Sequence, residues 1–96
     1  MDETAETRLK RLRLRSWRRG TKEMDLILGP WADACLAGLP AETLARFERL
    51  LDENDQDLYG WVTGQDAAVP EELAGLIAEI GRHARNRLGP GADRTG

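Results

Sequence analysis

The residues best suited to recognising another molecule surround a single glycine, in the stretch Arg19-Gly20-Thr21-Lys22-Glu23. Gly20 has no Cβ, so the backbone of a partner can approach it closely. Arg19 offers a planar fork of donors that suits carboxylates and carbonyls. Two interpretations are open. The stretch is either an exposed docking corner with Arg19 and Glu23 on either side of Gly20, or a helix C-cap in which Glu23 pairs with a nearby arginine.

Metal or nucleophilic chemistry has little support among the residue types of this chain. His83 and Cys35 are its only histidine and cysteine, and their separation matches neither metal-ligand spacing nor a catalytic pair. We expect His83 to be solvated or to cap a helix end, and Cys35 to pack in the core. Residues 60–64 do not fit a phosphate-binding glycine loop. We therefore predict no metal site, no cofactor-binding residue and no catalytic residue.

Four acidic residues cluster between the third and fourth expected helices: Asp52, Glu53, Asp55 and Asp57. Asp and Asn are preferred at helix starts, so capping on a solvated face is the simpler interpretation. The alternative is that Asp55 and Asp57 contribute to a surface that binds a partner. The sequence leaves both interpretations open.

Basic and acidic residues are unevenly distributed along the chain. Eight basic and no acidic residues lie between Arg8 and Lys22, whereas ten acidic and two basic residues lie between Glu42 and Glu79. Such a split can steer a charged partner or hold two halves of one fold together. A nucleic-acid-binding module that uses the basic helix is therefore the alternative function. The net charge of −3 argues against it, as does the lack of a known DNA-binding motif.

Length and composition indicate one small domain in a reducing compartment. The 96 residues suit a single domain, and one cysteine cannot form an intramolecular disulfide. We find no apolar run long enough to span a bilayer. The acidic residues Asp2, Glu3 and Glu6 argue against a secretory signal and against a mitochondrial transit peptide. We expect a cytoplasmic protein that does not insert into a membrane.

Apolar periodicity predicts five helices and no strand. The helices are expected over 4–18, from Thr21 to about Gly38, over 41–53, over 56–63 and from Pro70 to Leu88. Trp17 should share an inward face with Leu9 and Leu12. The second helix should kink where Gly29-Pro30 interrupts its apolar stripe. The expected fold is an all-α, compact five-helix bundle with short loops: a single domain over 1–88, followed by a disordered tail over 89–96.

The stretch around Gly20 resembles the core of the succinate dehydrogenase flavinylation factors. Their signature is R-G-x-x-E followed by [LM]-D-[LI], which is read here in Arg19-Gly20-Thr21-Lys22-Glu23-Met24-Asp25-Leu26. Phe47-Glu-Arg-Leu-Leu51 resembles the family's F-x-x-L-L, and Asp55-Gln-Asp57-Leu58-Tyr59-Gly60-Trp61 resembles its D-x-D-L-[YF]-x-W. The resemblance extends from about Leu12 to Ile80. The family includes bacterial FAD assembly factors of the SdhE type and their mitochondrial counterparts.

The resemblance implies an assembly factor, not an enzyme. Such a factor binds the flavoprotein subunit of succinate dehydrogenase, and in bacteria often that of fumarate reductase, and promotes covalent attachment of FAD to a histidine of that subunit. It implies partner contacts first through Arg19, Gly20 and Glu23, then through Asp25 and Asp57. We expect a monomer that binds no FAD stably and no nucleic acid. Phe47 and Trp61 also match family positions, but their periodicity predicts core positions. The arginine-rich first helix is a departure from the family pattern, and its role is open.

Overall fold

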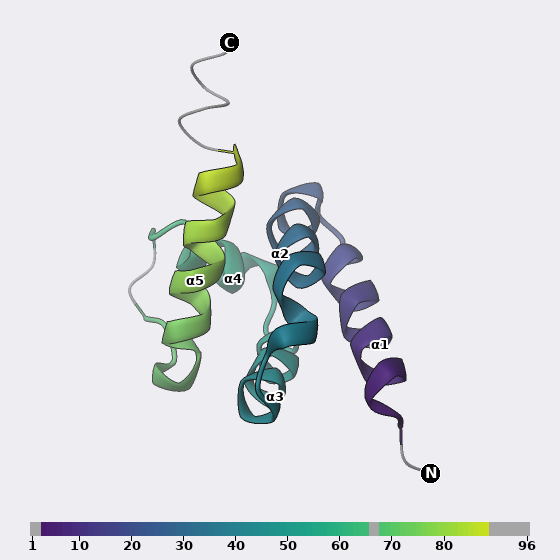
Figure 1. The fold of residues 1–96 in the computed structure, drawn as a ribbon. Helices are drawn as coiled ribbons and strands as arrows, with labels where there is room; N and C mark the ends of the chain where they lie inside the picture. Colours follow the sequence, from purple (N-terminus) through teal and green to yellow (C-terminus); the bar gives the residue numbers. More distant parts are fainter. Residues whose placement is uncertain (1–2, 66–67, 89–96) are drawn as a thin grey trace.

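Helix-start signals in the sequence become helix caps in the computed structural model, which describes residues 3–65 and 68–88 (Figure 1). Thr4, Thr21 and Asn54 each accept a backbone N–H from the residue three positions on. The helices are α1 (Ala5–Trp17), α2 (Lys22–Cys35), the short 3₁₀ helix η1 (Leu36–Gly38), α3 (Ala41–Leu50), α4 (Asp55–Val62) and α5 (Glu71–Leu88). No strand occurs in the described residues, and the predicted all-α bundle is confirmed.

Several helix boundaries differ from the sequence prediction. Those of α1 and α4 differ by one residue at each end, and α2 ends at Cys35, before the short helix η1. We expected α3 to continue to Glu53, but it ends at Leu50 and a turn follows. In that turn the N–H of Asp52 donates to the carbonyl of Arg49 at 3.0 Å, which is the tighter bonding of a closing helix end. Pro70 was expected to be the first residue of α5, but the helix begins one residue later. Differences of one or two residues are common at helix ends, because the last turns fray.

Helix α2 runs through Gly29-Pro30 without a break. Pro30 has no N–H, so the carbonyl of Leu26 loses its partner within the helix. Arg87 of α5 donates to that carbonyl at 3.3 Å. Gly29 is buried under the indole of Trp17, and a Cβ at this glycine would lie 2.3 Å from a ring carbon. Gly29 and Pro30 therefore both lie where α2 contacts a neighbouring helix.

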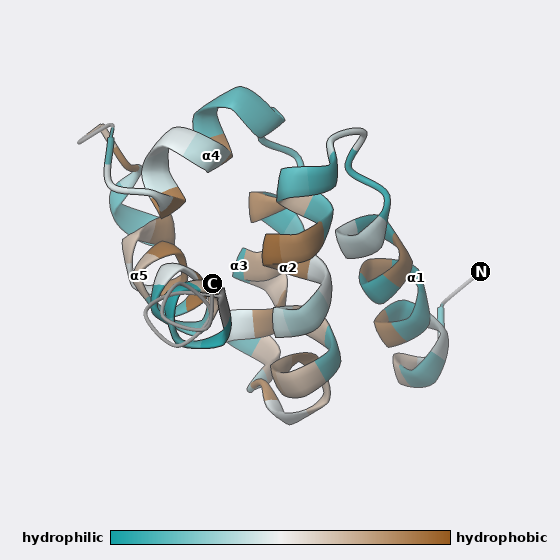
Figure 2. Ribbon diagram, turned by 90° about the horizontal axis from the view of Figure 1, so that it is seen from above, coloured by the Kyte–Doolittle hydropathy of each residue, from teal (hydrophilic) through white to brown (hydrophobic). Residues whose placement is uncertain are grey.

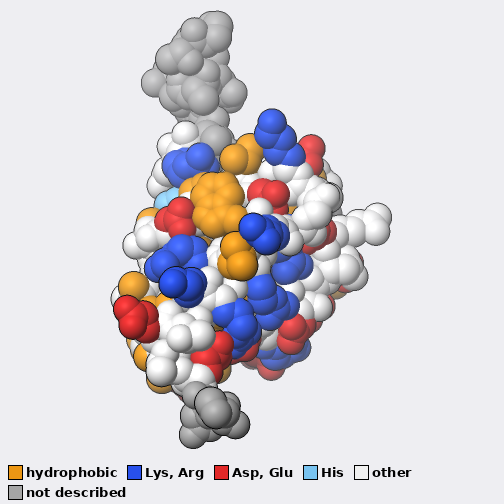
Figure 3. Space-filling model, turned by 90° about the vertical axis from the view of Figure 1, so that its right-hand side faces the viewer, with side chains coloured by type: hydrophobic (Ala, Val, Ile, Leu, Met, Phe, Trp, Pro, Cys, Tyr) orange, Lys and Arg blue, Asp and Glu red, His pale blue; other side chains and the backbone are white. Residues whose placement is uncertain are grey.

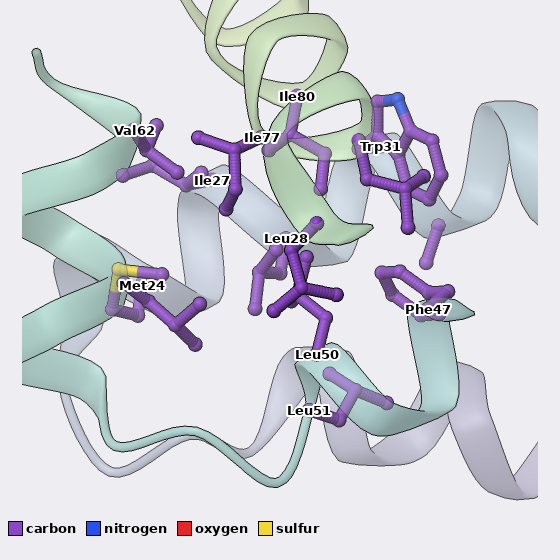
Figure 4. Close-up of a cluster of buried hydrophobic side chains, with 14 of the residues drawn as sticks. Met24, Ile27, Leu28, Trp31, Phe47, Leu50, Leu51, Val62, Ile77 and Ile80 are labelled. Carbon is purple, nitrogen blue, oxygen red and sulfur yellow. The ribbon is translucent and has the colours of Figure 1, made fainter. Parts of the chain in front are cut away.

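The core lies between α2 and the other helices. In Figure 1, α2 stands between α1 and α5, and Figure 2 shows hydrophobic stretches of α2, α3 and α5 turned toward the space between the helices. The rings of Trp31 and Phe47 lie with their centroids 5.1 Å apart (Figure 4), a separation typical of aromatic pairs. Seventeen hydrophobic residues of the described part are buried, Phe47 and Trp61 among them, as their periodicity predicted.

Two side chains lie elsewhere than expected. Trp17 keeps 37% of its surface exposed rather than joining Leu9 and Leu12 on the inward face, because its ring rests on the outside of α2 at Gly29. His83 was expected to be solvated or to cap a helix end. Instead it is half-buried, and its Nδ1 atom is buried without a hydrogen-bond partner. Cys35 packs at the edge of the core as predicted, and burial raises the pKa of its thiol.

The basic helix and the acidic body bind each other. Glu48 of α3 accepts from both Arg8 and Arg11 of α1 at 2.8 Å, and Arg15 pairs with Asp52 at 3.0 Å. Figure 3 shows the α1 side of the molecule, where basic and acidic side chains alternate around a small hydrophobic area. The uneven charge distribution could steer a partner or hold two halves of the fold together. The structure shows the second role, because these ion pairs hold α1 against α3.

The remaining sequence expectations concern the ends of the chain and membranes. The predicted disordered tail over 89–96 lies outside the described residues, so it stays a prediction. Within the described helices we find none whose length and apolar character would allow it to cross a membrane.

Candidate docking site

The site is built on the turn that joins α1 to α2. After α1 ends, Gly20 adopts a φ of +102°, a backbone conformation that L side chains rarely adopt. The backbone N–H of Arg19 donates to Oδ1 of Asp25 at 2.7 Å. Thr21 then caps α2 by accepting the N–H of Met24. The chain direction therefore reverses in a few residues, and the turn is fixed from both sides.

Arg19 lies inside this corner. Its side chain is only 10% exposed, and each of its three nitrogens donates a hydrogen bond. Nε donates to Asp55 at 2.8 Å, while the two terminal nitrogens donate to the carbonyls of Leu51 and Glu53 at 2.6 and 2.7 Å. The two carbonyls follow the C-terminal end of α3, where a positive charge is favourable, and Asp55 begins α4, where a negative charge is favourable.

The position of Arg19 corrects one expectation. We expected both charged members of the motif on the surface, one on each side of Gly20. The structure places only Glu23 there, because the guanidinium of Arg19 satisfies the acceptors between α3 and α4. Arg19 therefore positions the corner. A direct contact between Arg19 and a partner stays a prediction, limited to the small exposed part of its side chain.

Glu23 and Gly20 form the open part of the corner. Both are exposed, and the Glu23 side chain makes neither a hydrogen bond nor an ion pair with any described residue. Within residues 3–65 and 68–88, Glu23 therefore does not pair with an arginine, contrary to what the second interpretation expected. A Cβ at Gly20 would meet nothing closer than Oδ2 of Asp55 at 4.0 Å, so there is free space above the glycine.

A shallow hollow of about 350 Å³ lies beside Glu23. Its lining comes from the start of α2 and from α4: Thr21, Glu23, Met24, Asp55, Gln56 and Tyr59. Tyr59 keeps 39% of its surface exposed. Tyr59 and Gln56 were not among our predicted contact residues. The sequence could have indicated them, because both lie close to the buried Leu58 on a helix and therefore face away from the core.

The two remaining predicted contact residues are half-buried and have structural roles. Asp25 accepts the N–H of Arg19, which fixes the turn. Asp57 donates its N–H to Oδ1 of Asn54 at 2.8 Å and accepts from Nδ2 of Asn54 at 3.0 Å, which closes the start of α4. The cap of α4 is therefore Asn54, and the Asp57 carboxylate supports it by accepting from the cap's side chain. Whether either carboxylate also contacts a partner stays a prediction.

The corner offers several groups that can recognise another molecule. The residues that line the hollow present carboxylates, a hydroxyl, an amide and a phenol on an open surface. Among the described residues, no group of three or more His, Cys, Asp or Glu is arranged to hold a metal ion. The corner presents a rigid, partly negative surface, and Gly20 provides a position without a side chain at its edge.

Comparison with known proteins gives one family. Residues 10–84 match the family described as "Flavinator of succinate dehydrogenase". The FAD assembly factor SdhE of Pseudomonas aeruginosa is 50% identical over 75 residues, which cover 78% of this chain and 88% of the relative. The SdhE protein of Photobacterium profundum is 32% identical over 71 residues, which cover 74% and 81%.

A mitochondrial relative is also similar. Succinate dehydrogenase assembly factor 2 of Aspergillus terreus is 47% identical over 70 residues, which cover 73% of this chain but only 23% of that longer protein. Residues 10–84, which match the family, include the α1–α2 turn, the hollow beside Glu23 and nearly all of the core. By its sequence and by the region that the match covers, the chain belongs to the family of flavinators of succinate dehydrogenase.

Proposed function

We propose that this protein is an assembly factor that binds the flavoprotein subunit of succinate dehydrogenase and promotes covalent attachment of FAD to it. The family supports the proposal, and so do the names of the bacterial and mitochondrial relatives. One structural observation carries it: the family motif places an unpaired carboxylate, Glu23, and a side-chain-free position, Gly20, on one open corner. A surface charge with no internal partner is free to pair with another protein.

The covalent chemistry belongs to the flavoprotein and its FAD, and this protein supplies binding. In this proposal it is not an enzyme and holds no cofactor of its own. By docking on the subunit it stabilises a conformation in which the acceptor histidine lies against the flavin. Placing two reacting groups correctly can contribute up to about 7–11 kcal/mol to lowering a barrier, so docking alone is a sufficient mechanism.

Reversing the charge of Glu23 tests the docking role. Glu23→Lys should weaken binding to the purified flavoprotein subunit at least tenfold, which corresponds to about 1.4 kcal/mol, because an exposed attractive charge becomes repulsive. Glu71→Lys is the matched control, since Glu71 is also an exposed, unpaired carboxylate in the first turn of a helix. Each substitution removes a similar favourable interaction with its helix dipole. Equal affinities for the two variants would refute the docking role of the corner.

The same pair of variants gives a functional readout. In cells that lack the wild-type factor, Glu71→Lys should restore covalent flavin on the subunit and Glu23→Lys should not, as measured by in-gel flavin fluorescence. A substitution at Gly20 is a less specific test than Glu23→Lys. At a φ of +102° any side chain is strained, so the variant would lose stability as well as surface shape.

We extend the proposal to the finer points that the sequence raised. The flavoprotein subunit of fumarate reductase is a second partner in this proposal, as the resemblance to the family implies. The factor acts as a monomer in the cytoplasm of a bacterial cell. Co-purification from cell extract with each subunit tests the first point, and sedimentation of the pure protein tests the second.

Nucleic-acid binding, the alternative function, has less support than docking on a protein partner. It needs the arginines of α1 free for phosphates. Arg8, Arg11, Arg13 and Arg15 instead form ion pairs with carboxylates of the same chain. Displacing these internal carboxylates would cost ion pairs that hold α1 against α2 and α3.

A further inference from the structure

A second hollow continues from the docking corner between α2, α4 and α5. It measures about 430 Å³, and it shares Glu23 and Tyr59 with the first hollow, so the two form one continuous surface. Its walls are mostly apolar and include Leu26, Ile27, Tyr59, Val62 and Ala84. In Figure 4 the side chains of Ile27 and Val62 point toward each other from α2 and α4. We call this hollow the α2–α4–α5 groove.

A glycine brings the backbones of α4 and α5 together at this groove. A Cβ at Gly81 would lie 2.9 Å from the carbonyl oxygen of Val62, so α5 and the end of α4 approach more closely than any other residue would allow. Gly81 lines the groove but contributes no side chain to fill it. Helix α5 is in contact with both α2 and α4 beside this hollow.

The lining carries opposite charges on different helices. Glu23 comes from the start of α2, and Arg85 comes from the last part of α5. Both are exposed, and neither side chain has a hydrogen bond or ion pair with a described residue. An apolar groove with one free carboxylate and one free guanidinium fits a segment that carries apolar side chains between a basic and an acidic group.

We propose that the α2–α4–α5 groove receives an amphipathic segment of the flavoprotein subunit, with its basic group at Glu23 and its acidic group at Arg85. This inference rests on the proposed function and specifies how far the interface extends beyond the motif. A second copy of this chain is a poorer occupant, because two concave surfaces cannot fill one another. A segment of the larger partner that projects into the groove would bury Leu26 and Tyr59 and pair both charges.

Charge reversal at Arg85 is the first test. Arg85→Glu should weaken binding to the purified flavoprotein subunit at least tenfold, whereas Arg82→Glu should change it less than twofold. Arg82 is the matched control: it is exposed and unpaired one turn earlier on α5, and it does not line the groove. Far-ultraviolet circular dichroism of both variants checks that α5 is intact.

A photo-crosslinking amino acid at Thr63, in the groove lining, gives an independent readout. It should capture the flavoprotein subunit, whereas the same group at Ala78, exposed on α5 outside the groove, should not. If the wild type binds and Glu23→Lys does not, while Arg85→Glu behaves like Arg82→Glu and Thr63 captures nothing, the groove inference fails alone. If the wild type does not bind the subunit, the proposed function itself fails. Crosslinks between two copies through Thr63 would overturn the inference in favour of self-association.

Discussion

Replacing Arg19 with alanine should destabilise the fold more than any other single change at the α1–α2 turn. The substitution removes three hydrogen bonds at once: one to Asp55 and two to the carbonyls of Leu51 and Glu53. These acceptors lie where the side chain is only 10% exposed, so water replaces the guanidinium incompletely. The half-buried carboxylate of Asp55 also loses its partner.

The magnitude follows from those contacts. A hydrogen bond that involves a charged group contributes about 1.5–3 kcal/mol, and breaking a buried ion pair by removing one partner costs about 3–5 kcal/mol. Asp55 keeps 20% of its side chain exposed, so part of this cost is recovered by hydration. We expect a loss of about 2–4 kcal/mol in the free energy of unfolding, a large fraction of the 5–15 kcal/mol typical of a small domain.

Urea unfolding followed by circular dichroism measures this loss. Arg18→Ala is the matched control, because Arg18 is exposed and its side chain makes no hydrogen bond or ion pair with a described residue. Its effect should stay within about 0.5 kcal/mol. Arg19→Lys should fall between the two, since an ammonium group can pair with Asp55 but cannot match the planar fork. If Arg19→Ala and Arg18→Ala unfold at the same urea concentration, the internal role assigned to Arg19 is wrong.

Two further predictions concern the packing and charge of α1. Gly29→Ala should lose about 1–3 kcal/mol through overpacking against Trp17, and the loss should vanish in a Trp17→Ala background when the two changes are combined in a double-mutant cycle. Hydrogen bonds from Arg11, and to a lesser extent from Arg8, hold the pKa of Glu48 below its ordinary value of 4.5. The Glu48 carboxylate therefore stabilises the fold fully above pH 4.5. This stabilisation is lost as the pH falls through the lowered pKa of the folded protein. The difference in unfolding free energy between wild type and Glu48→Gln should therefore be constant near neutral pH and shrink in acid, and a difference that grows in acid would contradict this sign.

The sequence predicted the helices well because their signals are local. Thr21 and Asn54 cap helices through bonds to residues three positions away, and the stripe of α2 is visible in its spacing. Trp17 was misplaced because its partner, the bare backbone at Gly29, belongs to another helix. Helix α2 continues through Gly29-Pro30, where Arg87, far along the chain, donates to the Leu26 carbonyl in place of the N–H that Pro30 lacks, and the predicted kink stays a prediction.

The candidate site was predictable in its residues but not in their roles. Arg19 and Glu23 look equivalent in the sequence, as two charges flanking a glycine. The difference arises from three acceptors at the α3–α4 junction, more than thirty positions from Arg19. No periodicity or motif encodes where that junction lies relative to the turn. The groove beside the corner was missed for the same reason, because its walls come from three separate helices.

This division of roles separates two ways in which the motif can fail. A variant at Arg19 should lose flavinylation because the turn and the α3–α4 junction come apart, so its activity should follow the folded fraction and recover at lower temperature or with a stabilising osmolyte. A variant at Glu23 should remain folded under all these conditions and stay inactive. If cooling restores a Glu23 variant as fully as an Arg19 variant, then Glu23 also acts through the fold, and the exposed carboxylate does not make the docking contact.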